Sequence, residues 1–481
     1  MHSKIAGLAF LLLATTAIPT VAAPSGEDAA KIQAALDAYF GKQFNLVKVE
    51  PDGEIYKATV DFSTLIGTAK DSGVELTMPP LEFSLAPEGE GKWRVKRDGD
   101  FEFSGKMADK FNFKQTMTEF AVDAEFDEQL GTFTSSTGSV KTIDLKEEIT
   151  DAQSGPASVD MHVEDVSAES TVSANEAGGF DAKITEETGA TVVKESAKIS
   201  GGEPVAAELT AEKASAEYNL TGTKFKELMA FINFMGKHSD KDALLKDQAV
   251  YKILLQAMLP GFLNMTGTGS LNKIQIVTPV GNVNMDKLSY GLDMNGAVKD
   301  GKVKESLGIE GLKIPAGLAP PYASGMVPKN FNMDFTVSGF DPGTALTSVI
   351  AAMDLSKEPV IPKEMEAQLL TQLLPTGKVD INLGKSVLSN ELYTITVDST
   401  MSAGPAAMPS GKAHVTIKGM DEIMKAVQAA PPEANLQQGS ALIIVAKGLA
   451  KTESDGSLSW DVESTADGKV LVNGTDVNKL K

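Results

Sequence analysis

The sequence predicts an α+β fold that is mainly antiparallel β: a long twisted β-meander with repeated strand–helix–helix–strand units that pack amphipathic helices on the sheet. From Leu46 onward, most segments alternate apolar and polar residues, which is typical of strands with one solvated face. Turn sequences such as Asp98-Gly99 separate these segments. Helical spacing returns only in a few blocks of the second half, where one order of landmarks recurs. A β-sandwich or a solenoid is the competing architecture.

Composition excludes several classes of function. The 481 residues carry 44 Lys and Arg against 65 Asp and Glu, a formal net charge of −21, and no Cys. Without Cys, disulfides, thiolate metal sites and cysteine nucleophiles are ruled out. Nucleic-acid binding needs a cationic surface, which an acidic chain whose arginines are confined to Arg94 and Arg97 does not supply.

Residues 1–22 are expected to form a cleavable signal peptide. Lys4 precedes an apolar stretch, Ile5–Ile18, and the small residues Thr20 and Ala22 follow it. The stretch is too short for a membrane span, although an uncleaved N-terminal anchor and cleavage after residue 23 are alternatives. No later run reaches 18 apolar residues, so no transmembrane segment is expected after cleavage. The Cys-free, Lys-rich and acidic composition favours the periplasm of a Gram-negative bacterium.

Residues 23–210 are predicted to form a β-rich region that opens with one helix. The helix is expected over Gly26–Gly41, because Ile32 and Leu36 stand at helical spacing and Gly41 suits its C-terminus. Strands such as Phe120–Phe126 follow it.

The rest of the chain is predicted to consist of three related units. Their ranges are 211–328, 329–410 and a shortened 411–481. In each unit a strand ends at a glycine and two helices follow; the glycines are Gly222, Gly339 and Gly419. The second helix ends at Leu-Pro in the first two units, with Pro260 and Pro375 at a nearly equal offset from the glycines. A generic strand–Gly–helix sequence is the simpler interpretation.

Catalytic and cofactor motifs are missing from the sequence. It holds no nucleophile elbow, no phosphate loop and no dinucleotide fingerprint. His162, His238 and His414 stand in distant segments without metal-ligand spacing. We therefore expect a non-enzymatic protein without a metal or cofactor. An Asp/Glu-dependent hydrolase stays open because carboxylates are abundant, although 2 Trp are few for a sugar-binding cleft.

The apolar helices of the first unit suggest a ligand site. A surface helix needs one apolar face, and Phe231 and Phe234 lie off the main stripe of the first helix. Flexible Met side chains can adapt to varied apolar ligands. The candidate ligand-binding residues are Phe225, Met229, Phe231, Phe234, Met235, Leu255 and Met258. Ordinary packing of helices on a sheet is the alternative.

The strand–Gly–helix–helix–Leu-Pro–strand blocks and the ending Gly468–Gly474 resemble a group of uncharacterised exported proteins. These proteins have about 500 residues and are typical of alphaproteobacteria and related Gram-negative bacteria. The alternating strands are more distantly similar to the AsmA-like and YdgA-like envelope proteins. The resemblance covers residues 210–481 and implies no catalytic residues. Unlike AsmA-like proteins, the chain is not expected to retain a membrane anchor.

These observations favour a periplasmic envelope protein that binds or shields an apolar, lipid-like ligand between its helices and its sheet. The mechanism would be burial of acyl chains against Phe and Met side chains. A structural or assembly factor that binds envelope proteins through its sheet edges is the alternative.

Overall fold

The structure is a computed structural model, and part of the chain is described in it. The described residues are 24–40, 46–70, 73–107, 110–151, 155–176, 178–198, 204–238, 240–405, 407–431 and 437–479. The predicted signal peptide lies outside them. The chain divides into two compact units: an N-terminal unit, Met1–Leu209 with Lys213–Met258, and a C-terminal unit, Thr210–Glu212 with Leu259–Lys481. The division after Met258 falls inside the predicted range 211–328.

Antiparallel strands dominate the N-terminal unit. They are β1 (Val47–Asp52), β2 (Ile55–Val60), β3 (Val74–Thr77), β4 (Leu81–Gly89), β5 (Lys92–Met107), β6 (Phe111–Asp127), β7 (Thr132–Asp151), β8 (Gly155–Asn175), β9 (Gly179–Thr188), β10 (Thr191–Lys198), β11 (Pro204–Ala211) and β12 (Lys213–Thr223). Each strand from β4 to β8 pairs with the next. The long β8 then pairs with β10 along its first half and with β9 along its second half, and β9 pairs with β12.

Among the described residues of the N-terminal unit, the helices are α1 (Gly26–Phe40), α2 (Ser63–Lys70), α3 (Phe225–Lys237), α4 (Lys241–Lys246) and α5 (Gln248–Met258). The first, α1, matches the predicted helix. Its N-terminus is capped by Ser25, whose Oγ accepts a hydrogen bond from Asp28 N at 3.1 Å. Gln33 ties α1 to β1, because its Nε2 donates to Val47 O at 2.5 Å and its Oε1 accepts from Val49 N at 2.8 Å.

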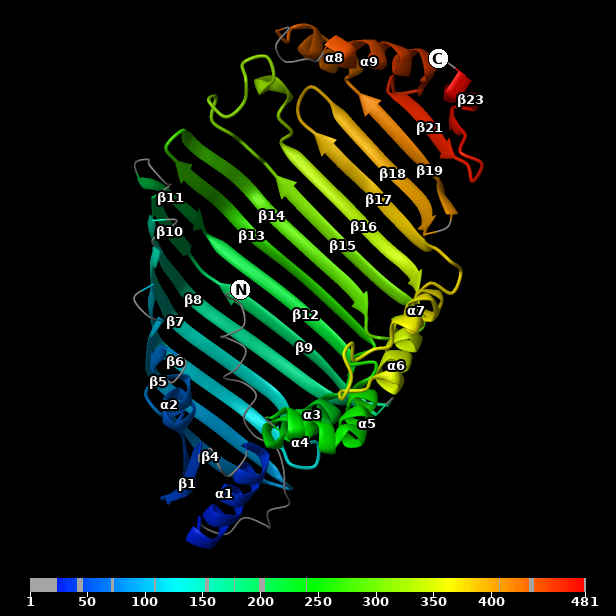
Figure 1. The fold of residues 1–481 in the computed structure, drawn as a ribbon. Coiled ribbons are helices and arrows are strands. Elements are labelled where there is room, and N and C mark those ends of the chain that lie inside the picture. The colour runs from blue at the N-terminus through cyan, green and yellow to red at the C-terminus, as the bar shows by residue number, and fades with distance from the viewer. Residues whose placement is uncertain are drawn as a thin grey trace. The chain divides into compact units, whose positions relative to one another are not determined.

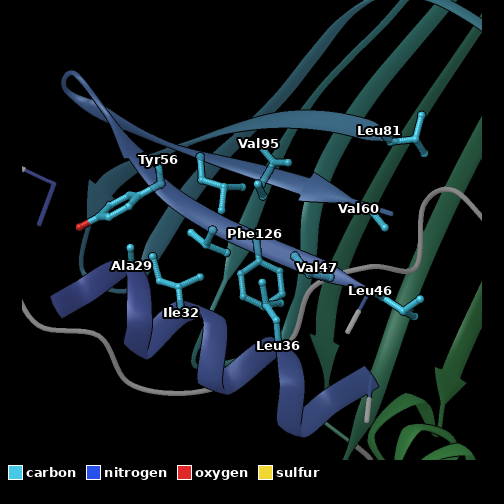
Figure 2. Packing of buried hydrophobic residues seen from close by; sticks show 13 residues of the cluster. Ala29, Ile32, Leu36, Leu46, Val47, Tyr56, Val60, Leu81, Val95 and Phe126 are labelled. Atoms are coloured by element: carbon cyan, nitrogen blue, oxygen red, sulfur yellow. The ribbon is translucent and has the colours of Figure 1, made fainter. Parts of the chain in front are cut away.

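A hydrophobic core lies between α1 and the first strands (Figure 2). Ala29, Ile32 and Leu36 of α1 belong to one buried cluster with side chains of β1, β2, β4, β5 and β6. The other members of the cluster are Leu46, Val47, Val49, Tyr56, Ala58, Val60, Leu81, Leu85, Val95 and Phe126. Burial of this apolar surface fixes the helix against the sheet.

The C-terminal unit is a second antiparallel array. Its strands are β13 (Asn264–Thr278), β14 (Gly281–Asn295), β15 (Gly301–Glu310), β16 (Asn330–Phe340), β17 (Val379–Ser389), β18 (Thr394–Gly404), β19 (Ala407–Lys418), β20 (Lys451–Thr452), β21 (Leu458–Ser464), β22 (Val470–Val472) and β23 (Thr475–Asp476). From β13 to β19 each strand pairs with the next, and β19 pairs with β21. Its helices are α6 (Pro342–Ala352), α7 (Glu366–Leu373), α8 (Met420–Gln428) and α9 (Gln437–Leu449).

The helices after β12, β16 and β19 differ from the prediction in their placement. They were expected to pack on the sheet, but Figure 1 shows them at the strand ends of their own units. Within each group the helices pack on one another, α3 with α5, α6 with α7 and α8 with α9. Each group follows a glycine with left-handed φ: Gly222 (64°), Gly339 (82°) and Gly419 (81°). Gly222 and Gly339 use this conformation at a bulge just before the strand ends, and Gly419 uses it between β19 and α8. The repeat itself stays a prediction.

Candidate functional site

The predicted ligand-binding residues of α3 and α5 lie at a helix–helix contact. Phe231 and Phe234 contact Tyr251 of α5, with ring centroids 5.7 and 6.3 Å apart. Phe225 meets Phe180 of β9 edge-on at 6.3 Å. Phe234 is buried; the other predicted residues are half-buried, namely Phe225, Met229, Phe231, Met235, Leu255 and Met258. The structure therefore brings Phe231 and Phe234 together with Tyr251, which the sequence reasoning did not select.

An ion pair ties α3 to the helices that follow it. The His238 ring stacks on Phe234 at 3.9 Å, its Nδ1 lies 2.8 Å from Phe234 O, and its Nε2 lies 2.8 Å from a carboxylate oxygen of Asp247. The carbonyl of Phe234 and the ionised carboxylate of Asp247 can only accept hydrogen bonds. The protonated imidazole has two N–H donors and can therefore donate to both. The hydrogen bond to Asp247, with a further contribution from Phe234 O, raises the pKa of His238 above its ordinary value.

A continuous apolar row crosses the sheet of the C-terminal unit. Directly paired residues in an antiparallel sheet share one face, so register identifies the members of a row. Eight strands contribute one residue each, in the order Leu271, Leu288, Ile309, Phe331, Leu388, Ile395, Ile417 and Leu458. Each of these side chains is half-buried. We call this set the apolar row.

A second apolar set runs beside the apolar row on the same face. It consists of Met265, Met294, Val303, Val337, Ile381 and Met401. Between the two sets lie Tyr290 and Leu307, which are directly paired and 46% and 37% exposed. Glu305 is also on this face, exposed, and opposite Phe335. The face is thus predominantly apolar and accessible to solvent.

The opposite face of the same sheet is polar. Eight strands contribute one residue each to a row of directly paired polar residues: Thr266, Asp293, Lys304, Thr336, Asn382, Thr400, Lys412 and Glu463. Lys302 and Asp293 form an ion pair at 2.8 Å on this face, and Lys412 lies 3.6 Å from Glu463. Water can hydrate the polar side chains of this face. Burial against a ligand would therefore stabilise the apolar face more than the polar one.

The N-terminal unit carries a smaller apolar face. Phe101, Met117, Ile143 and Val163 are directly paired across four strands, as are Met107, Phe111, Ile149 and Ala157. Met107 is 51% exposed and Ile149 37%. Glu147 interrupts this face between Phe113 and Val159, and its side chain is buried.

Arg97 of β5 is a buried cation at a bulge. It is 8% exposed, and its guanidinium lies over the Phe120 ring at 4.6 Å. It donates to the carbonyls of Gly99, Asp100 and Phe120 at 3.2 to 3.3 Å, and its Nε has no partner in the described residues. Burial lowers the pKa of this guanidinium from its ordinary value. These hydrogen bonds stabilise the bulge of β5 between Gly99 and Phe101.

The remaining two described histidines lie on polar strand faces. His162 Nδ1 is 2.8 Å from Asp144, and His414 Nδ1 is 2.8 Å from Asp461, its direct partner on β21. The hydrogen bond to Asp144 raises the pKa of His162. These are exposed cross-strand pairs, and no metal-ligating group of three His, Asp or Glu occurs within the described residues.

The sequence reasoning placed the candidate ligand site on helices and missed the sheet face. The signal for the face was present, because each strand alternates polar and apolar residues. Alternation shows that a strand has an apolar side but not which residues of other strands stand beside it. Among the described helices, none combines the length and the apolar character needed to cross a bilayer. Comparison with protein-family models, curated proteins and solved structures finds no match to the chain.

Proposed function

We propose that the protein binds acyl chains of a lipid along the apolar face of its C-terminal sheet, as a component of the bacterial envelope. The observation that carries the proposal is the apolar row, an unbroken series of half-buried aliphatic and aromatic side chains across eight paired strands. The predicted signal peptide supports an envelope location.

The dimensions of the row suit an acyl chain. Neighbouring strands lie about 4.8 Å apart, so eight strands extend over roughly 34 Å. One lipid leaflet contributes about half of a hydrocarbon core that is roughly 30 Å thick. A single acyl chain therefore fits along the row, and each methylene removed from water contributes about 0.8 kcal/mol.

The chemistry of the face favours hydrocarbon over a polar ligand. The apolar row consists of Leu, Ile and Phe and presents no side-chain hydrogen-bonding group. The second set adds three methionines, Met265, Met294 and Met401, whose flexible thioethers adapt to chains of different shape. Glu305, a charged residue on this face, is exposed and remains hydrated.

The test compares two neighbouring residues of β17 that face opposite sides. Leu388 belongs to the apolar row, whereas Val387 pairs with Asn332 and Thr396 on the polar face, and both side chains are half-buried. Binding of a fluorescent palmitate analogue is expected to weaken about tenfold in Leu388→Asn, which corresponds to about 1.4 kcal/mol. Val387→Asn is expected to bind as the unaltered protein does.

A second measurement identifies the natural ligand and its position. Native mass spectrometry of protein from its own host, followed by organic extraction, should reveal an acyl-chain species in stoichiometric amount. A photoreactive palmitate should label peptides that contain members of the apolar row. An apo mass together with labelling on the polar face, or equal weakening in Val387→Asn and Leu388→Asn, contradicts the proposal.

A further inference from the structure

The outer faces of α3 and α5 are apolar although they are exposed. Leu228 and Ile232 lie one turn apart on α3 and are 40% and 50% exposed; Val250 and Ile253 on α5 are 45% and 63% exposed. We call these four residues the helical patch. Figure 1 shows α3, α4 and α5 gathered at the ends of β9 and β12 in the N-terminal unit.

Packing within the helix cluster does not account for the helical patch. The inner sides of α3 and α5 already meet through Phe231, Phe234 and Tyr251. The exposed residues of α5 are Ala249, Val250, Ile253, Gln256 and Ala257, none of them charged. A surface helix normally exposes charged or polar residues opposite its apolar stripe, so α5 has an additional apolar side that no other described part of the chain covers.

The segment that carries the helical patch has a net charge of the opposite sign to that of the whole chain. Residues 224–258 contain six lysines against four carboxylates, whereas the whole chain has a net charge of −21. Lys237, Lys241 and Lys246 are exposed, and no ion pair within the described residues involves them. The helices α6 and α7 expose Leu346 and Leu370, but residues 341–374 carry five carboxylates against two lysines.

We propose that the helical patch docks the protein on an anionic membrane surface. Amphipathic helices bind membranes by burying apolar side chains at the boundary of headgroups and acyl chains while their lysines contact anionic headgroups. The helix cluster α3 to α5 meets both requirements, because it exposes Leu, Ile and Val together with lysines that form no ion pair within the described part of the chain. The proposal goes beyond acyl-chain binding and stands without it, since it depends on α3 to α5 and not on the C-terminal sheet.

Vesicle cosedimentation tests the docking surface. The purified protein should bind vesicles of phosphatidylethanolamine and phosphatidylglycerol, and bind phosphatidylcholine vesicles at least tenfold more weakly. Ile232→Ser with Ile253→Ser should reduce binding to the anionic vesicles at least tenfold. Lys241→Glu with Lys246→Glu should do the same and remove most of the salt dependence.

The matched control is Leu346→Ser with Leu370→Ser, which removes two exposed leucines from an acidic helix pair and should leave vesicle binding unchanged. All of these changes lie on exposed side chains, and circular dichroism verifies folding. An Ile253→Trp variant adds a direct readout, since its fluorescence should be quenched by brominated anionic lipid.

Three results overturn the proposal. One is equal binding to both vesicle types, and another is undiminished binding in Ile232→Ser with Ile253→Ser. The third is a dimer that these substitutions dissociate in light scattering without any vesicle binding, which would show that a second copy of the chain covers the helical patch. None of these results bears on palmitate binding by the C-terminal sheet.

Discussion

Arg97 is a buried, charged residue whose side chain forms hydrogen bonds with the backbone. Its guanidinium donates to three backbone carbonyls at the β5 bulge and stacks on Phe120. A guanidinium presents several donors in a planar fork, which the single ammonium group of lysine does not reproduce. The residue therefore stabilises an irregular backbone at the junction of the α1 core and the open sheet.

Replacing Arg97 is expected to destabilise the N-terminal unit. Arg97→Met should lower the free energy of unfolding by about 2–3 kcal/mol, because buried carbonyls lose a charged donor. Arg97→Lys should not restore it. Urea unfolding measures the effect, and Arg94→Lys, a change of a one-third exposed arginine of the same strand, is the control. A loss below about 0.5 kcal/mol in Arg97→Met would show that the bulge is stable without this residue.

His238 makes the α3–α5 cluster sensitive to pH. The pKa of His238 is raised in the folded protein by its hydrogen bond to Asp247. The stabilisation is therefore complete below the unfolded pKa of about 6.5 and is lost as pH rises through the higher folded value. Hydrogen exchange of the α3 amides should accelerate as the pH rises above about 6.5, beyond the intrinsic rate increase. The excess should vanish in His238→Gln, and its persistence there would assign it to another group.

At the scale of the element, α1 differs from the later helices because it lies against the sheet. Ile32 is 6% exposed within the core cluster, while Ala30 on the same helix is exposed. Ile32→Ala should cost about 2–4 kcal/mol through lost burial and a residual cavity. Ala30→Ser should cost about 0.5 kcal/mol or less. Equal losses in a denaturant titration would mean that the α1 contact does not stabilise the unit.

The entry into α8 depends on one glycine. Gly419 has a φ of 81°, and a Cβ there would lie 2.0 Å from Leu392 O. Gly419→Ala is expected to destabilise the end of β19 and the start of α8 by about 1–3 kcal/mol. Gly448→Ala in α9, where a Cβ meets nothing within 4 Å, should be neutral or stabilising. Hydrogen exchange across α8 distinguishes a local opening from global loss, and unchanged protection in Gly419→Ala would refute the expectation.

At the scale of the whole molecule, the sheets of both units expose an apolar face. A ligand that binds only the native face must stabilise the folded protein by mass action. Palmitate at about 100 times its Kd should add about 2.7 kcal/mol and raise the unfolding temperature. The shift should be retained in Val387→Asn and reduced in Leu388→Asn. A shift of the same size in both variants would locate the ligand elsewhere.

The positions of many strands and helices were predictable from the sequence. The period-two alternation predicted antiparallel β, and Ile32 and Leu36 at helical spacing predicted α1. Helices were also predicted after Gly222, Gly339 and Gly419, and the structure contains helices after all three glycines. These features depend on interactions between residues that are close in the sequence, so they can be predicted from local patterns.

Tertiary structure decided where those elements meet. Leu271 and Leu458 are 187 positions apart in the chain, yet one apolar row joins them through seven successive pairs, because each register depends on the partner strand. The helices lie at strand ends because they bury their apolar sides on one another, which periodicity alone does not distinguish from packing on a sheet. The sequence by itself determined the two-sided strands and the helices; only long-range pairing determined that the apolar sides form one open face, since that depends on contacts between distant residues.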